Sequence, residues 1–291
     1  MTYALSIRSN AGSNRAARSL SRHTHAVHTS VGRLSSGLRV QSSSDDSAAL
    51  AVAETMRADQ AGVRMAIRNA TEAVAMLQTA ESGLATIGDL KIRMRELAVQ
   101  AASDGVKDDE RALLNTEYQE LLEEIERVAD VVEYNGQGLL AADGGNAGGV
   151  VDADGDAASR FVFQIGFQDS ADDQLTVDIK TAVSTNLQGT SIGSRADAQE
   201  VIGTIDLVLN GSNGHLSERA NIGANLNRLY TAITSLQSQA QNFETAVGNK
   251  RDADLGDESL EFNTSQVLQN AGVAMLAQAN AQQNVALRLL G

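Results

Sequence analysis

One stretch of the chain decides the fold, residues 45–102, which read DDSAALAVAETMRADQAGVRMAIRNATEAVAMLQTAESGLATIGDLKIRMRELAVQAA. Its large apolar residues recur mostly three or four positions apart, which is the spacing of one face of an α-helix. No proline interrupts the pattern, and Ser44 can cap the first turn. We therefore expect one long amphipathic helix that other helices of the chain must lie along, because a single helix buries too little apolar surface by itself.

The composition also favours packed helices. Hydrophobic residues make up 42% of the chain and aromatic residues only 3%, so the core must be built mainly from Ala, Leu, Val and Ile. The formal net charge of −14 repels nucleic acid and anionic membranes, and neither is expected as a partner. The chain has no Cys and no run of about 18 apolar residues. We expect no thiolate metal site, no cofactor and no transmembrane helix.

Both ends of the chain carry a further helical pattern. An apolar stripe with steps of four and three runs from Leu20 to Leu38. A last helix is expected from Phe262 to Leu290, and its apolar face can pack on the first stripe. Because such a pair buries too little to hold itself, the apolar surface that it leaves exposed is expected to be covered by neighbouring copies in a polymer. The residues expected to serve assembly on these terminal helices are Leu20, Val27, Val31, Leu34, Leu38, Val267, Leu268, Ala271, Met275, Val285 and Leu289.

The clearest coiled-coil pattern runs from Ile222 to Val247, and it is the natural partner of residues 45–102. A further helix is expected to open at Asp108, whose acidic first turn suits a helix N-terminus. Residues 210–215 break the helical pattern, so a kink or short loop is expected there. The expected core of this bundle is Val63, Ile67, Val74, Leu77, Leu97, Leu121, Ile125, Leu226, Leu229, Ile233, Leu236 and Phe243.

A small β-hairpin is expected at about residues 160–180, because the apolar segments 161–165 and 175–179 flank a polar turn. The predicted fold is therefore mainly α, an elongated antiparallel helical bundle with one hairpin. Gly37 and the serines that follow it mark a joint between two domains. We expect one domain to pair the two chain ends, residues 1–43 and 251–291, and the other to span residues 44–250.

Several motifs follow one another in a fixed order, and on them the chain resembles bacterial flagellin over about residues 1–140 and 195–291. Ala49 stands where the family usually has Gly. There is no room for the large variable domains that most flagellins carry, so the resemblance is to a short form. The motifs are Arg33-Leu-Ser-Ser-Gly-Leu-Arg39, Asp45-Asp-Ser-Ala-Ala-Leu-Ala-Val52, Arg95-Glu-Leu-Ala-Val-Gln100, Tyr134-Asn-Gly-Gln-Gly-Leu-Leu140, Ile222-Gly-Ala-Asn-Leu-Asn-Arg228 and Val267-Leu-Gln-Asn-Ala-Gly272.

The resemblance implies a structural subunit that self-polymerises into the extracellular flagellar filament used for swimming. Terminal helices would form an inner tube and the bundle an outer tube. It also implies type III export without a cleaved signal peptide, and an export chaperone, a filament cap and hook-filament junction proteins as partners. Some flagellins bind an innate immune receptor, and the matching positions here are Arg93, Leu97, Gln100 and Glu117.

Four other motifs are weaker. His23, His25 and His28 could suggest a metal site, but no carboxylate joins them. Residues 136–141 loosely match a dinucleotide fingerprint but follow a helix instead of a strand. Residues 152–163 begin like a calcium loop but lack its later ligands.

The fourth motif, Gly189-Thr-Ser-Ile-Gly193, fits a nucleophile elbow, with Asp206 and His215 in triad order. We expect instead a loop that caps the helix starting near Ser194. Two functions remain as alternatives to a filament subunit. One is a hook-filament junction protein, which shares the terminal helices, and the other is an enzyme. The absence of a catalytic constellation argues against the enzyme.

Overall fold

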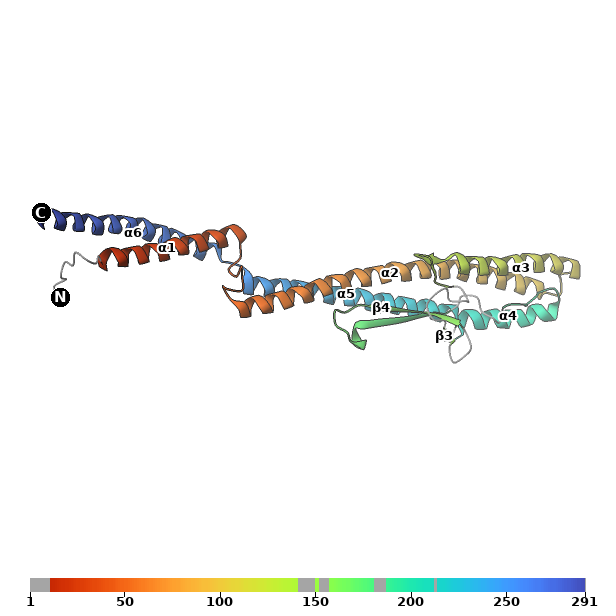
Figure 1. Ribbon diagram of the computed structural model, residues 1–291. Helices are drawn as coiled ribbons and strands as arrows, with labels where there is room; N and C mark the ends of the chain where they lie inside the picture. Colours follow the sequence, from red (N-terminus) through yellow and green to blue (C-terminus); the bar gives the residue numbers. More distant parts are fainter. Residues whose placement is uncertain (1–10, 141–149, 152–156, 181–186, 212–213, 291) are drawn as a thin grey trace. The chain divides into compact units, whose positions relative to one another are not determined.

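The computed structural model describes residues 11–140, 150–151, 157–180, 187–211 and 214–290, with the backbone alone described at 150–151, 157–158 and 282–290. The protein is mainly α-helical with a small antiparallel sheet, which confirms the predicted fold class (Figure 1). The helices are α1 (Ala11–Ser36), α2 (Ser47–Ala101), α3 (Asp108–Val131), α4 (Arg195–Asn210), α5 (His215–Arg251) and α6 (Leu255–Leu290).

The chain forms two compact units. Unit 1 consists of Met1–Asp59 and Asn242–Gly291, and unit 2 of Gln60–Gln241, so α2 and α5 contribute to both. In unit 1, α1 and α6 lie side by side and run antiparallel (Figure 1). The domain boundaries expected near residues 43 and 250 remain predictions.

The start of α2 differs in detail from the sequence-based expectation. Asp46 caps the helix, because its Oδ1 accepts a hydrogen bond from the Ala49 N–H over 2.8 Å. The Ser44 hydroxyl instead shares a hydrogen bond with the Ser42 hydroxyl. The prediction that Ser44 caps α2 is therefore wrong, and the cap lies two residues further along.

Unit 2 has a core to which one face of α2 contributes many small residues. Ala66, Ala70, Ala73, Leu77 and Ala80 are spaced by three and four and are all fully buried. Alanines at these steps let neighbouring helices approach closely, which explains how a chain with so few aromatic residues packs its interior. The helices α3, α4 and α5 add Tyr118, Leu122, Ile125, Val201, Ile205, Ile222, Leu229 and Leu236 to this core.

The sheet covers one side of this core with alternating side chains. Strand β4 (Ala157–Gln164) lies between β3 (Val150–Val151) and β5 (Gln174–Lys180), and both pairings are antiparallel. On β5, Leu175, Val177 and Ile179 are buried while the residues between them face outward. This alternation is the signature of a sheet with one face on the core, and it confirms the predicted hairpin.

A shorter hairpin follows α3. Strands β1 (Glu133–Tyr134) and β2 (Gln137–Gly138) are joined by Asn135 and Gly136, both with positive φ. That backbone is the usual two-residue hairpin turn, which Asn-Gly favours. The two leucines that follow, Leu139 and Leu140, are fully buried and anchor the turn on the bundle.

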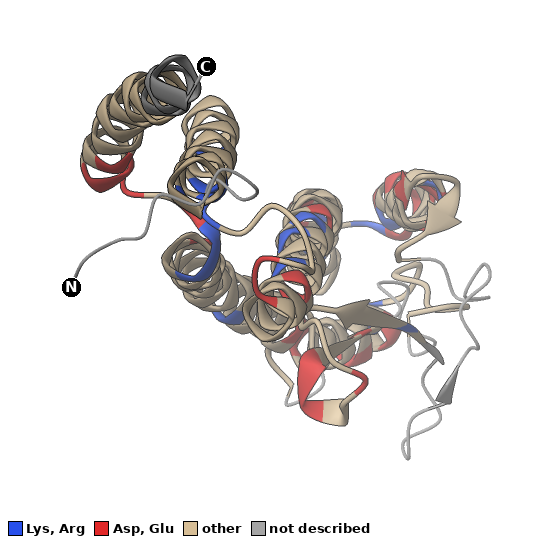
Figure 2. Ribbon diagram, turned by 60° about the vertical axis from the view of Figure 1, so that its left-hand side comes forward, with Lys and Arg blue, Asp and Glu red and all other residues tan. Residues whose placement is uncertain are grey.

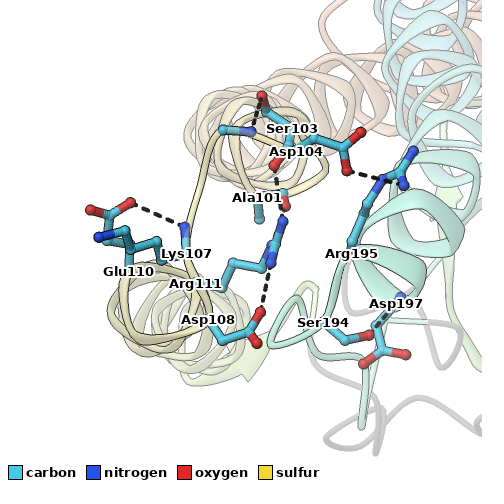
Figure 3. Close-up of polar contacts among 11 residues, drawn as sticks. Ala101, Ser103, Asp104, Lys107, Asp108, Glu110, Arg111, Ser194, Arg195 and Asp197 are labelled. Carbon is cyan, nitrogen blue, oxygen red and sulfur yellow. Dashed lines mark hydrogen bonds and ion pairs between the residues drawn. The ribbon is translucent and has the colours of Figure 1, made fainter.

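The turn between α2 and α3 is held by one buried arginine (Figure 3). The guanidinium of Arg111 donates to the carbonyl oxygens of Ala101 and Ser103, over 2.8 and 2.9 Å, and to the carboxylate of Asp108 over 2.7 Å. The last carbonyls of a helix lack partners inside the helix. Arg111 supplies partners for them and ties the start of α3 to the end of α2.

Candidate assembly surface

The pairing of α1 with α6 uses small and polar residues. The Gln269 side chain donates to the Thr24 hydroxyl over 3.0 Å, and the Ser13 hydroxyl donates to the Asn280 side chain over 3.0 Å. Gly272 faces Leu20, because a Cβ atom added to this glycine would lie 3.5 Å from the Leu20 Cδ1. These contacts all lie along one narrow face of each helix.

At the other end of the pair, the loop after α1 joins the segment before α6. Gly37 has a φ of 71° and its N–H donates to the Arg33 carbonyl, which is the glycine cap that ends many helices. The Gly37 carbonyl accepts from the Ala253 N–H over 2.9 Å. Arg33 also pairs with the buried carboxylate of Glu258 over 3.5 Å. Gly37, the glycine of the motif at residues 33–39, is thus required by its backbone.

The apolar stripe of α6 faces outward. Leu260, Val267, Ala271 and Met275 follow one another at helical steps, and all four are exposed, with 66% of Val267 and 65% of Met275 accessible. Leu268 is exposed as well. The prediction that these residues pack on α1 within one chain is therefore wrong, because α1 takes the smaller face of α6 that contains Gly272.

The stripe of α1 is partly covered. Leu20, Val27, Leu34 and Leu38 are half-buried, and Val31 is exposed. The side chains of Val285 and Leu289 lie outside the described residues. Unit 1 therefore leaves an apolar surface, which we call the α6 stripe and define as Leu260, Val267, Leu268, Ala271 and Met275, open to solvent.

The residues expected in the bundle core occupy two levels of burial. Ile67, Leu121, Leu226, Ile233 and Phe243 are half-buried. The fully buried members of the set are Val63, Val74, Leu77, Leu97, Ile125, Leu229 and Leu236.

The four positions that match receptor contacts do not form one exposed patch. Arg93 bridges α2 and α3 by donating to Glu117 over 2.7 and 3.0 Å, and it also pairs with Glu96. These hydrogen bonds, that to Glu117 first, raise the pKa of Arg93. Gln100 is exposed, but Leu97 is only 1% accessible and lies in the core. A protein partner at this place would reach Arg93, Gln100 and Glu117 without touching the Leu97 side chain.

Several residues of the weaker chemical motifs make structural contacts instead of forming a catalytic or metal site. The Ser191 hydroxyl donates to Asn115, Asp206 pairs with Arg95 over 2.6 Å, and Ser194 caps α4 by accepting from the Asp197 N–H. His25 and His28 are exposed on α1. Within the described ranges, no three potential ligands of the His, Cys, Asp and Glu types come together as a metal site. The calcium-like segment begins at residues 152–156, which lie outside the described residues.

One buried site with two titratable side chains was not expected from the sequence. His215, the first residue of α5, lies against α2 at Gly88, where an added Cβ atom would be only 2.7 Å from the His215 Nε2. Lys91 of α2 is 2% accessible. Burial, followed by the charges of Lys91 and Arg219, lowers the pKa of His215 to about 4, and burial lowers that of Lys91 to about 8. Nothing in the spacing of these residues marks them as buried.

Taken together, these features are those of a structural protein built for assembly. Its chain ends form a helix pair with an uncovered apolar stripe, and its polar motifs serve packing. Among the residues that the structure describes, no helix combines the length and the apolar character needed to cross a bilayer.

Comparison with known proteins identifies the family. The bacterial flagellin N-terminal helical region matches residues 7–144, and the bacterial flagellin C-terminal helical region matches residues 205–290. The chain is 36% identical to a flagellin of Halalkalibacterium halodurans over 262 residues, which is 89% of each chain. It is 33% identical to the flagellin of Bacillus subtilis over 295 residues, covering 93% of this chain and 95% of the relative.

A filament protein of a spirochaete is similar as well. The flagellar filament 30.7 kDa core protein of Treponema maltophilum is 31% identical over 292 residues, 98% of this chain and 99% of that protein. Among solved structures, the crystal structure of Bacillus cereus flagellin is 28% identical with a TM-score of 0.45, over 62% of this chain and 94% of the other. The chain belongs to the bacterial flagellin family, whose members are structural subunits of the flagellar filament. The relatives named here do not favour the rival interpretation as a hook-filament junction protein.

Proposed function

We propose that this chain polymerises into the extracellular flagellar filament through the surface of its paired ends, with the α6 stripe as the central contact between copies. The single observation that carries this proposal is the exposure of that stripe on a helix pair that joins through a different face of α6, the one with Gly272 and Gln269. An apolar patch of this kind marks an interaction site in a soluble protein.

The same surface accounts for a helical polymer. A contact between two different faces of identical copies does not close on itself unless the rotation happens to form a ring. The α6 stripe and the half-buried stripe of α1 are different faces of one unit. Copies added one after another through such faces build an open filament.

Further roles are proposed on family membership. The terminal domain, residues 1–43 and 251–291, forms the inner tube, and residues 44–250 form the outer tube. The subunit leaves the cell through the flagellar type III apparatus. An export chaperone, a filament cap and hook-filament junction proteins are its partners on that route.

The protein acts as a building block and not as an enzyme. Of the residues that match a triad in chain order, Ser191 donates to Asn115 and Asp206 pairs with Arg95, while the His215 ring is packed against Gly88 of α2. A hydrolase would need these side chains to form hydrogen bonds with one another. Recognition by an innate immune receptor at Arg93, Gln100 and Glu117 is a subsidiary hypothesis, and a receptor reporter assay that stays silent with dissociated monomer would remove it.

Seeded growth tests the proposal. Purified monomer is added to filament fragments, and polymer is measured by sedimentation and electron microscopy. Val267→Asp combined with Met275→Asp should abolish elongation, because charge on the stripe cannot be buried between copies. Circular dichroism should show that the variant monomer keeps its helical content, since both side chains are exposed.

Leu113→Asp is the matched control, because Leu113 is a similarly exposed apolar residue on α3 of unit 2. It should elongate filaments at a rate close to that of the wild type. A wild-type chain that never elongates seeds would overturn the proposed function. Normal elongation by the Val267 and Met275 variant would overturn the assignment of the stripe.

A further inference from the structure

Unit 1 has its charges divided between its two helices. Residues 1–44 contain six arginines, at positions 8, 15, 18, 22, 33 and 39, and neither Asp nor Glu, although the whole chain has a net charge of −14. Residues 252–287 have the opposite composition, with acidic residues at the start and neither Lys nor Arg. Such a division within one antiparallel helix pair calls for a physical explanation.

The basic residues of α1 form a continuous exposed row. Arg15, Arg18 and Arg22 are spaced by three and four, so they share one face of the helix, and His25 continues that face. All four side chains are exposed. We call this set the α1 arginine row.

Among the residues that the structure describes, the part of α6 beside the α1 arginine row carries no acidic side chain. The hydrogen bonds of Ser13 with Asn280 and of Thr24 with Gln269 place this part of α1 against residues 269–280 of α6. That part of α6 carries no charged residue. The row therefore lacks the neutralising neighbours that an antiparallel partner helix could have provided.

The acidic residues gather at the other end of the pair. Asp254, Asp257 and Glu261 are exposed at the start of α6, where Figure 2 shows the acidic part of this helix. The arginine next to them, Arg33, is already paired with the buried Glu258. We call Asp254, Asp257 and Glu261 the α6 acidic end.

We infer that the α1 arginine row of one subunit lies against the α6 acidic end of a neighbouring subunit in the polymer. This inference rests on the proposed function and adds the register of the contact to it. The ion pair of Arg33 with Glu258 places Arg33 beside the α6 acidic end of its own subunit. Arg18 lies fifteen residues before Arg33 in α1. At 1.5 Å per residue, a neighbour displaced by about 22 Å along the helix axis brings the two charged sets together.

Charge complementarity of this kind selects one arrangement against others. A neighbour without displacement would place the α1 arginine row beside residues 269–280 of α6, which carry no charge, and would leave both charged sets unpaired. The displaced arrangement pairs opposite charges. Complementary charges at an interface mainly set register and association rate, and apolar contacts supply most of the affinity. In the polymer, the α6 stripe would thus supply most of the affinity, and the two charged sets would fix the register.

Paired charge-reversal variants test this contact. The first variant carries Arg18→Glu and Arg22→Glu, and the second carries Asp257→Arg and Glu261→Arg. Each alone turns the contact into a repulsion between like charges, so seeded elongation should slow by at least about tenfold. An equimolar mixture should elongate again, because the reversed row of one variant meets the reversed acidic end of the other. A chain with all four substitutions should also elongate.

Glu123→Arg with Asp130→Arg is the matched control of the second variant, because it makes the same change in net charge at exposed positions of α3 in unit 2. It should elongate like the wild type. A second pair of measurements uses the neutral variant Arg18→Gln with Arg22→Gln, which preserves the fold without repulsion. Its elongation rate should fall less steeply with added NaCl than that of the wild type.

The outcomes separate the inference from the proposed function. Wild-type growth together with normal growth of both single-set variants would overturn the inference and leave the proposed function standing. Failure of each variant without recovery in the mixture would show that the arginines meet a different partner, which also overturns it. Failure of the wild type itself would instead count against the proposed function.

Discussion

The Arg111 Nε donates a hydrogen bond to the carbonyl oxygen of Ala101 over 2.8 Å, and so the first turn of α3 closes the last turn of α2. The same guanidinium reaches Ser103 and Asp108. Arg111 is 7% accessible, and its planar group satisfies two main-chain oxygens and one carboxylate at once. The direction in which the chain turns back between these helices depends on this side chain.

Replacing Arg111 by Ala should lower the free energy of unfolding of unit 2 by about 3 kcal/mol, since two carbonyl oxygens would lose charged donors in a buried place. Urea denaturation followed by circular dichroism measures this change. Arg127→Ala is the control, because Arg127 is exposed and pairs with Glu124 one turn away. Its effect should stay below about 0.5 kcal/mol. Equal effects of the two substitutions would contradict the role given to Arg111.

The sequence was sufficient to predict the helices and the hairpin but not the buried charged residues. Apolar spacing alone predicts the face of α2 that carries Val63, Val74 and Leu77, because burial on a helix repeats every three to four residues. Arg111, Lys91 and His215 have no such signal. A charged residue on a helix is usually solvated, and its burial here is decided by neighbours that are distant in sequence.

The α6 stripe shows a different limit of sequence reasoning. Its spacing correctly marks Val267, Leu268 and Met275 as an apolar face, yet they do not pack within the chain. Periodicity reports that a face avoids water but not whether the same chain or another copy covers it. The contact of α1 with α6 instead uses Gly272 and the polar pair Thr24 and Gln269, which hydrophobic patterning does not detect.

The buried His215 should make unit 2 sensitive to acid. Its pKa in the folded chain is about 4, against 6.5 for the unperturbed group, so the unfolded chain binds more protons in this interval. The associated stability is complete above pH 6.5 and is lost as the pH falls through 4, with a total of about 3 kcal/mol. The groups around the ring are Lys91 and Asp89 of α2 and Arg219 of α5.

Urea midpoints measured between pH 7 and pH 4 test this dependence on the monomer. The His215→Leu variant should lose the part of the acid sensitivity that belongs to this ring, while the carboxylates common to both proteins titrate as before. The exposed His25 provides the control, and His25→Leu should follow the wild-type curve. Parallel curves for the wild type and His215→Leu would exclude the ring as the source.

Lys91 should have an effect of the same sign at alkaline pH. Its folded pKa is about 8 and its unperturbed value 10.5, so between these values the unfolded chain again binds more protons. Stability should therefore gain up to about 3 kcal/mol as the pH rises from 8 to 10.5. The Lys91→Met variant should lack this gain when the free energies of unfolding of the two proteins are subtracted. A difference that stays constant over this pH range would contradict the assignment.

Gly37 should be the most sensitive glycine of unit 1. Its φ of 71° is unfavourable for residues with a side chain, although no atom lies within 4 Å of an added Cβ. Gly37→Ala should therefore destabilise the end of α1 by about 1 kcal/mol through backbone strain alone. Amide hydrogen exchange of residues 30–40 in the monomer measures this change, and a faster exchange there is expected.

Gly223→Ala is the control, because Gly223 lies inside α5 with open space around it and ordinary backbone. That substitution should stabilise its helix by about 0.5–1 kcal/mol, the opposite sign, since alanine is the better helix former. Faster exchange in both variants would show that the effect at residue 37 does not come from its left-handed backbone.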